Sequence, residues 1–243
     1  MAGHSVSAGR SLRHYGDGVG IGELAEGPLH AALKQQLSRP GYRFEVPVER
    51  WVVDLVRSDG ELVEIQTGGF GPLGRKLDGL LDQHRMRIVH PVPGRRWVVR
   101  TDAAGAVLSR RRSPRAGRPT EIFDVLVAFP TLIGHPHLVI EVLVCEEEHV
   151  RAAAPVQKGR RRRDPGVRHL VGILESYEIR QPDDVLGLLG APLPAEAFTT
   201  AELGTLVGVP TVLAQRITFC LRLLELIEPA GKRGRAPLYR TRA

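Results

Sequence analysis

Two carboxylates in one short, apolar segment are the residues of this chain best suited to chemistry. Asp54 stands in a strand-like run at residues 51–57, and Glu64 follows an Asp-Gly type of turn at residues 58–60. Because side chains alternate along a strand, Glu64 and Gln66 point to one face, and Asp54 lies near both across the turn. Carboxylates held together among apolar residues repel each other unless a cation compensates. Their hard oxygen atoms suit Mg²⁺ or Mn²⁺, which can activate water and neutralise charge on a phosphodiester.

The alternative interpretation is that the pair consists of ordinary exposed strand residues, as aspartate and glutamate in a hairpin most often are. Asp54, however, stands between Val53 and Leu55. A carboxylate with apolar neighbours on both sides needs a partner if its strand is buried. The pattern therefore favours a metal site.

The elements that must position this pair follow from the apolar pattern. Leu29, Leu33 and Leu37 repeat at helical spacing after Pro28, and residues 38–41 end that helix. In order, we expect a helix from Pro28, strands at 43–48, 51–57 and 61–67, a helix with Leu73, Leu77, Leu80 and Leu81 on one face, and a strand at 87–92. This order is α-β-β-β-α-β.

The element order, together with Asp54 and the sequence Glu64-Ile65-Gln66, resembles the core of the PD-(D/E)XK nuclease superfamily over about residues 21–92. The resemblance implies an α/β fold with a mixed sheet flanked by helices. It also implies that Asp54 and Glu64 bind the metal ion and that the last residue of the motif orients the attacking water. A glutamate on the first helix often joins them, which here is Glu26 or, as the second choice, Glu23.

Gln66 departs from the family pattern, in which this residue is usually lysine. A glutamine can orient a water molecule but brings no positive charge to the scissile phosphate. Arg75 and Lys76, on the second expected helix, are the candidates to supply that charge. A nuclease fold kept only for DNA binding is the alternative that this replacement leaves open.

The rest of the first domain and the connection after it are expected from composition and periodicity. A hairpin is expected at 97–112, a short helix at 121–128, and a buried strand at 138–145 that the acidic residues 146–148 close. Ala, Pro, Gly and Arg dominate residues 151–166, which is typical of a linker. We expect a flexible tail at 1–20, a nuclease-like α/β domain at 21–150, a basic linker at 151–167 and a winged-helix domain at 168–243.

The C-terminal region carries the clearest local signals. Thr199-Thr200-Ala201-Glu202 is a capping box that begins a short helix with Leu203, Leu206 and Val207 on one face. After a tight turn at 208–210, a longer helix directs inward Leu213, Ile217, Cys220, Leu221 and Leu224. Two strands then enclose the basic residues 231–235. This order resembles the winged helix-turn-helix family over about residues 199–243. The hairpin and helix at 53–81 look like an uncharacterised bacterial family that combines both parts.

DNA is the partner that this module predicts. A helix fits the major groove, and basic residues on a wing neutralise phosphates. The expected DNA-binding residues are Thr211, Gln215, Arg216 and Arg222 on the longer helix, and Lys232, Arg233 and Arg235 on the wing. Winged helices also serve protein contact, so a homodimer and a transcription regulator without enzyme activity stay open as alternatives.

Composition agrees with a polyanionic partner. The formal net charge is +7, and basic residues cluster at 109–118, 158–163 and 231–235. No apolar run approaches the length needed to cross a bilayer, and the first twenty residues contain no apolar segment typical of a signal peptide. Cys145 and Cys220 each lie in an apolar stretch, which predicts core residues. We therefore expect a cytoplasmic, nucleoid-associated protein with no membrane contact.

Overall fold

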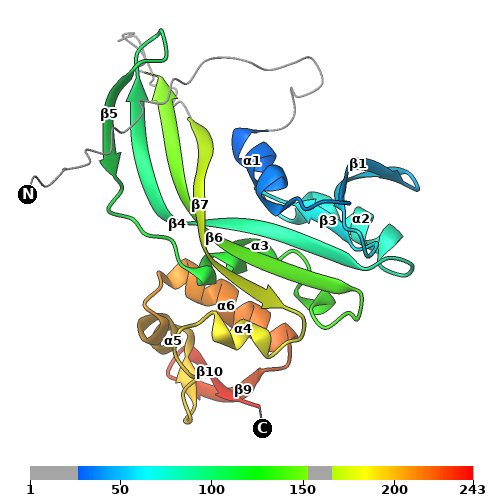
Figure 1. Ribbon diagram of the computed structural model, residues 1–243. Coiled ribbons are helices and arrows are strands. Elements are labelled where there is room, and N and C mark those ends of the chain that lie inside the picture. The colour runs from blue at the N-terminus through cyan, green and yellow to red at the C-terminus, as the bar shows by residue number, and fades with distance from the viewer. Residues whose placement is uncertain (1–26, 153–165, 243) are drawn as a thin grey trace, which may run out of the picture.

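The computed structural model describes residues 27–152 and 166–242 (Figure 1). The N-terminal tail, Glu23, Glu26 and most of the expected linker lie outside these residues. The described chain is an α/β fold in which a curled mixed sheet is flanked by helices. The fold class expected from the sequence is confirmed at this level.

The large sheet has seven strands in the order β1-β2-β3-β4-β6-β7, with β5 paired to β4. The strands are β1 (Arg43–Val48), β2 (Trp51–Val56), β3 (Leu62–Ile65), β4 (Met86–Thr101), β5 (Val107–Arg112), β6 (Leu138–Ala152) and β7 (Val167–Ile179). Strands β3, β4 and β6 are parallel, and the other pairs are antiparallel. Helix α2 (Gly74–Leu80) connects β3 to β4, so the expected α-β-β-β-α-β order is confirmed.

Helices cover both faces of this sheet. On one face, α1 (Pro28–Leu37) packs Leu29 and Leu33 against a cluster that includes Leu55 and Val63 of the sheet. On the other face, a larger apolar cluster joins the sheet to α2 and to the elements that follow β5. These elements and the turn before α2 are η1 (Gly71–Leu73), η2 (Pro119–Ile122), α3 (Phe123–Leu126), η3 (Pro130–Leu132) and α4 (Asp184–Gly187).

Strand β6 continues through the acidic residues that were expected to close it, so that expectation is wrong. Each carboxylate pairs with an arginine from elsewhere in the sequence: Glu146 with Arg95 at 3.1 Å, Glu147 with Arg168 at 2.9 Å and Glu148 with Arg110 at 2.7 Å. Paired and hydrogen-bonded charges remove the cost of placing carboxylates inside a sheet. A local sequence pattern cannot show such partners.

Strand β4 unites two segments that the sequence suggested were separate strands, and it bends between them. A bulge lies between Pro93 and Arg95, where proline, which lacks an N–H, is tolerated within a sheet. A Cβ at Gly94 would come within 2.3 Å of Val144 Cγ1, so the close approach of β4 to β6 requires glycine. Figure 1 shows both long strands curving away from the β1–β3 part of the sheet.

A smaller unit follows β7. Its elements are β8 (Phe198–Thr199), α5 (Thr200–Val207), α6 (Thr211–Leu223), β9 (Ile227–Arg233) and β10 (Ala236–Thr241), with strand order β8-β10-β9. The capping box of Thr199 and Glu202 is confirmed, and Gly208 follows α5 in the left-handed conformation with φ 71°. In the described ranges no single helix is long and apolar enough to span a membrane, and α5 with α6 reaches that length only as a pair bent by 109°.

The packing of α5 and α6 agrees with the sequence except at one position. All five inward positions expected on α6 and its end are buried: Leu213, Ile217, Cys220, Leu221 and Leu224. Leu206, expected on the inner face of α5, is 45% exposed, whereas Leu203 and Val207 are buried. A short amphipathic helix has room for fewer inward residues than its apolar count suggests.

A separate C-terminal domain was expected to start at residue 168, but in the structure this residue lies in a strand of the large sheet. Strand β7 pairs with β6 from Val150↔Val167 to Ile140↔Ile179, so it belongs to the large sheet. One apolar cluster contains residues from β2 to β9. In addition, Arg118 Nη1 donates a hydrogen bond to the carbonyl of Val207 at 2.8 Å. A segment rich in Gly and Arg can connect two strands of one sheet as well as two domains, and composition does not distinguish these cases.

Arg87 of β4 ties several segments of the sheet together. Its side chain is only 7% exposed and contacts Glu61 at 3.1 Å, Glu141 of β6 at 2.9 Å and Glu178 of β7 at 2.5 Å. Removing one partner from a buried ion pair leaves an uncompensated charge, which is strongly destabilising.

Replacing Arg87 with leucine should therefore lower the free energy of unfolding by about 3–5 kcal/mol. Chemical denaturation followed by circular dichroism measures this change. Arg85→Leu is the matched control, because its ion pair with Asp59 is 54% and 55% exposed on the two sides, and solvent screening leaves such a pair little effect on stability. Equal losses in the two variants would contradict the role of Arg87.

Candidate functional site

Asp54 lies where β2 and β3 separate. The two strands pair only at Leu55↔Val63 and Val56↔Leu62. Beyond these pairs, the backbone amide of Ile65 donates a hydrogen bond to Asp54 Oδ2 at 2.7 Å. A side-chain carboxylate thus replaces the backbone acceptor that a paired strand would provide, and this bond fixes Asp54 beside the β3 residues that follow the turn.

Helix α1 supplies further partners for Asp54, whose side chain is 15% exposed. His30 Nε2 lies 3.1 Å from Asp54 Oδ2, and Lys34 Nζ lies 3.8 Å from Oδ1. Burial acts to raise the pKa of Asp54, but the hydrogen bonds from His30 and Ile65 and the charge of Lys34 outweigh it. The pKa lies below its ordinary value, so Asp54 is ionised at neutral pH.

Glu64 lies in the opposite electrostatic situation. Burial raises its pKa first, and the negative charge of Asp54 raises it further, while Lys76 opposes both. Lys76 Nζ of α2 contacts Glu64 Oε2 at 2.5 Å and the carbonyl of Val52 at 2.6 Å. Asp54 and Glu64 therefore form a coupled pair, half embedded in the sheet, whose charges are balanced by cations from both flanking helices.

Gln66, the third residue of the motif, follows the end of β3. The side-chain amide of Gln66 donates to the carbonyl of Gly69 at 2.8 Å, and the backbone carbonyl of Gln66 contacts His90 Nδ1 at 2.6 Å. Burial lowers the pKa of His90 to about 4, so this imidazole is neutral at physiological pH. These contacts fix Gln66 at the start of the loop that leads to α2.

Of the two cations considered on the second helix, the structure brings only one to the carboxylates. Lys76 is 7% exposed and bonds to Glu64, whereas Arg75 is exposed on the outer side of α2. Glu26, the further glutamate expected at this site, lies outside the described residues.

His30 and Lys34 are the residues near Asp54 that sequence reasoning missed. They stand four residues apart, each directly after a buried leucine, Leu29 and Leu33. On a helix, this spacing places both side chains on one face beside the apolar stripe. The spacing was visible in the sequence, but nothing local indicates that this face lies over Asp54.

The residues expected to contact DNA are divided between free and engaged positions. Thr211, Gln215 and Arg222 of α6, and Lys232 and Arg235 of the β9–β10 hairpin, are exposed. Arg216 instead pairs with Asp124 of α3 at 2.5 Å, and Arg233 pairs with Glu202 at 2.5 Å. The same helix also exposes apolar side chains, with Val212 59%, Phe219 43% and Leu223 42% exposed.

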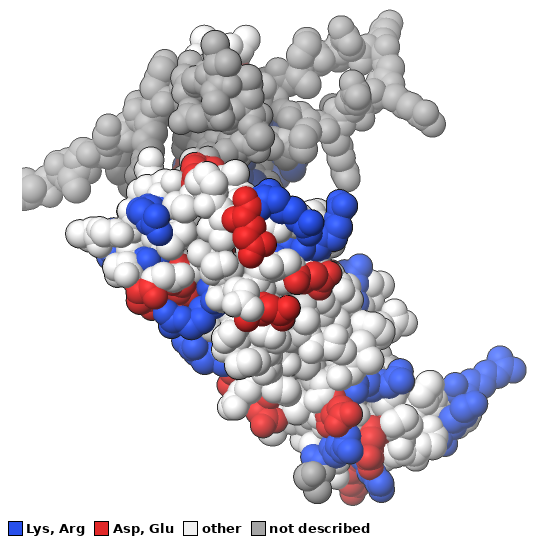
Figure 2. Space-filling view, turned by 90° about the vertical axis from the view of Figure 1, so that its right-hand side faces the viewer, with Lys and Arg blue, Asp and Glu red and all other residues white. Residues whose placement is uncertain are grey.

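Charged side chains on the α1 and β1 side of the molecule do not form one continuous basic surface. Figure 2 shows lysines and arginines interspersed with aspartates and glutamates on this face. On this face, positive and negative side chains therefore lie close together. Both cysteines are free and buried, which confirms that they are core residues.

The donor set of the carboxylate pair bears on metal binding. Within residues 27–152 and 166–242, no group of three or more His, Cys, Asp and Glu side chains is arranged to hold a metal ion. Asp54 and Glu64 supply two acidic groups. Asp54 Oδ2 contacts His30 Nε2 and the Ile65 amide, and the Glu64 carboxylate accepts hydrogen bonds from Lys76 and from the backbone of Asp54.

Comparison with known proteins defines the family of this chain. Residues 27–180, from α1 to the end of β7, match the domain of unknown function DUF8091, and the chain belongs to this family. A protein of Treponema pallidum (strain Nichols), described as an uncharacterized protein, is 33% identical over 224 residues, which cover 90% of this chain and 87% of that one. No solved structure matches. The family match ends where β7 ends, in agreement with the place of β7 in the large sheet.

Replacing Lys76 with methionine should destabilise the protein in a pH-dependent manner. Without Lys76 the pKa of Glu64, already above its ordinary value of 4.5, rises further. A carboxyl with a raised folded-state pKa binds its proton more tightly in the folded state, so stability is lost as pH rises from the unfolded pKa through the folded one. Melting temperatures across pH should show a larger loss at neutral than at mildly acidic pH.

The control for this prediction is Lys76→Met combined with Glu64→Gln. This double variant has no titrating carboxyl at position 64, so the pH-dependent part of the loss should disappear. A loss that is the same at every pH in the single variant would contradict the electrostatic role of Lys76.

Proposed function

We propose that this protein is a metal-dependent DNA endonuclease with a PD-(D/E)XK type of core. The observation that carries the proposal is the coupled, partly buried pair of Asp54 and Glu64 at the point where β2 and β3 separate. The element order and the parallel pairing of β3 with β4 across α2 support the same core. Two carboxylates at such a point are expensive for the fold unless they serve chemistry.

The donor chemistry of the pair fits Mg²⁺ or Mn²⁺. Asp54 and Glu64 would hold the ion, since both carboxylates offer hard oxygen atoms and the charge of Asp54 acts directly on Glu64. When bound, the ion activates water and neutralises charge on the phosphodiester. Burial and the charge of Asp54 raise the pKa of Glu64 although Lys76 opposes them, and a bound cation would lower this pKa further.

The protein's own side chains have distinct tasks in this proposal. His30 and the Ile65 amide orient the Asp54 carboxylate, and Lys76 orients Glu64. Lys76 also brings the positive charge that Gln66 lacks, on the opposite side from Lys34 of α1. Gln66, held by Gly69, would orient the attacking water.

The C-terminal unit would direct this core to DNA as a winged helix. Its order of short helix, turn, longer helix and two-stranded hairpin supports that interpretation. Thr211, Gln215 and Arg222 are exposed on α6, and Lys232 and Arg235 on the hairpin. With Arg216 and Arg233 engaged in ion pairs, few side chains remain for base readout, which favours binding dominated by backbone and shape.

The second candidate is a DNA-binding protein on a nuclease fold without activity. Two observations favour it. Gln66 stands where a lysine is usual, and both carboxylates already have cationic partners within the protein, Lys76 for Glu64 and Lys34 near Asp54. The two candidates differ in whether a divalent ion binds and whether DNA is cut.

Asp54→Asn and Glu64→Gln should each abolish cleavage, because each removes a metal-binding charge while nearly preserving shape. The assay is incubation with Mn²⁺ or Mg²⁺ across single-stranded, duplex, nicked and branched DNA. DNA affinity should stay the same or improve, because a negative charge beside a phosphate is removed. The divalent ion should raise the melting temperature of the wild type and not of the variants.

The controls separate the two candidates. Gln66→Lys introduces the usual family residue and should preserve or raise the cleavage rate. No cleavage of any substrate, together with no metal-dependent thermal shift, would leave the DNA-binding protein without activity as the better description. Cleavage that persists in both carboxylate variants would place the chemistry elsewhere.

The wing should contribute to DNA affinity by neutralising phosphates. Changing Lys232 and Arg235 together to alanine should weaken binding and lower the slope of log K against log salt by about 0.9 for each phosphate that is no longer neutralised. Arg240→Ala with Arg242→Ala is the matched control, because these arginines already pair with Glu228 and Glu225. Equal salt slopes in the two double variants would contradict a contact between the wing and DNA.

A further inference from the structure

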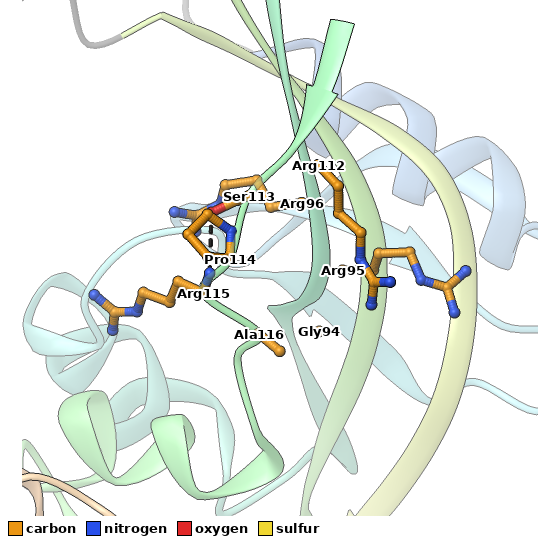
Figure 3. Close-up of a pocket in the computed structure, with 8 residues that line it drawn as sticks. All are labelled: Gly94, Arg95, Arg96, Arg112, Ser113, Pro114, Arg115 and Ala116. Carbon is orange, nitrogen blue, oxygen red and sulfur yellow. Dashed lines mark hydrogen bonds between the residues drawn. The ribbon is translucent and has the colours of Figure 1, made fainter.

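A hollow of about 300 Å³ opens at the bend of β4, away from Asp54 and Glu64 (Figure 3). Four arginines line it, two from the bend (Arg95, Arg96) and two from the end of β5 and the segment after it (Arg112, Arg115). None of the described residues that line it is acidic. Figure 3 shows Arg95 and Arg112 extending to one side of the hollow and Arg96 and Arg115 to the other.

Backbone hydrogen bonds fasten the walls of this hollow. The amide of Ser113 donates to the carbonyl of Arg96 at 2.8 Å, and the amide of Gly117 donates to the carbonyl of Pro93 at 3.0 Å. A Cβ at Gly117 would come within 2.6 Å of the same Pro93 oxygen, so this close approach requires glycine. The arginines therefore project from a fixed frame, which lowers the entropic cost of binding a ligand.

The charges of these arginines are unequally balanced. Arg95 pairs with Glu146 at 3.1 Å, and Arg115 lies 3.3 Å from Glu121. Arg96 and Arg112 form no ion pair with any residue of the described ranges, and Arg96 Nε is buried there without a hydrogen-bond partner. Burial lowers the pKa of Arg96. The negative charges of Glu147 and Glu121 oppose this shift, and the positive charges of Arg168 and Arg115 add to it. An anion in the hollow would provide an acceptor for Arg96 and a counter-charge for Arg112.

The hollow shares Arg96 with a second hollow of about 310 Å³, which reaches Thr67 and Gly68. Those residues directly follow Gln66, whose backbone carbonyl contacts His90 in the same second hollow. Glu121 and Asp124 also line the second hollow, whereas the described lining of the first hollow contains no acidic residue.

We propose that the hollow at the bend of β4 binds the phosphate backbone of DNA, which Arg112 contacts from one side and Arg96 from the other. Planar guanidinium groups with several donors match the oxygens of a phosphate. This inference rests on the proposed function, because it takes DNA as the ligand. It places the DNA strand, beyond the carboxylates, along the β4–β5 side of the sheet. Neither helix α6 nor the wing would contact DNA on that side.

The test compares two double variants that remove the same amount of charge. Arg96→Gln with Arg112→Gln removes the proposed contacts, and Arg100→Gln with Arg111→Gln removes exposed arginines of the same two strands. Arg111 is a close control for Arg112, since neighbouring side chains on a strand point to opposite faces. Fluorescence anisotropy with a short labelled duplex, in the absence of divalent metal, measures affinity across salt concentrations. Arg115→Gln, at a side chain 73% exposed, gives a second variant with little risk to the fold.

The expected result is a salt slope lower by about 0.9 for each phosphate that the Arg96/Arg112 variant no longer neutralises, with a smaller change in its control. Equal slopes would overturn the inference even if the wild type cleaves DNA. A lower slope in a protein that never cleaves would support the inference while contradicting the nuclease proposal.

A second measurement distinguishes DNA from free phosphate as the ligand. Thermal shifts with inorganic phosphate are recorded for the wild type and the Arg96/Arg112 variant. If inorganic phosphate stabilises only the wild type while both proteins bind DNA equally well, the hollow serves a small phosphate and the assignment to DNA is wrong. If the wild type binds no DNA at all, both the inference and the DNA-binding part of the proposed function fail.

Discussion

Strands β4 and β6 run parallel from Met86↔Leu138 to Thr101↔Ala152, and each other strand of the large sheet is attached to this pair directly or through its neighbours. The first half of the pair supports β3 and, through it, the hairpin that carries Asp54 and Glu64. The second half supports β5 and β7 and the arginines of the bend. Because the two strands stay paired on both sides of the bulge between Pro93 and Arg95, the spacing between the carboxylates and the bend is set by this one pairing.

Local patterns in the sequence predicted those elements whose stability is local. The leucine spacing after Pro28 predicted α1, the Asp-Gly type of turn predicted the hairpin, and the capping box at Thr199 predicted α5. What the sequence could not indicate depends on distant partners. The continuation of β6 through Glu147 needs Arg168, and the approach of His30 to Asp54 needs the packing of α1 over the sheet. The sequence shows the helical spacing of His30 and Lys34, but it does not indicate that these two residues lie beside Asp54.

The basic character of the chain also has two origins that composition cannot separate. Part of it is structural, since arginines such as Arg87 and Arg168 neutralise carboxylates inside the sheet. Another part is exposed or lies at the bend of β4, where Arg96 and Arg112 form no ion pair with described residues. The net charge of +7 therefore overstates the breadth of the positive surface and understates its concentration at a few places. Electrostatic attraction depends on that concentration more than on the total.

The apolar cluster that runs from Val53 in β2 to Ile227 in β9 has a consequence for folding. Elements that share one core depend on the same buried surfaces, so the unfolding of one exposes the other and their transitions are coupled. The C-terminal unit and the large sheet are therefore expected to melt together, in a single cooperative transition, although the family match ends at residue 180. The unit after β7 supplies residues to the same core as the sheet, and its removal would leave the α3 side of the sheet without its apolar cover.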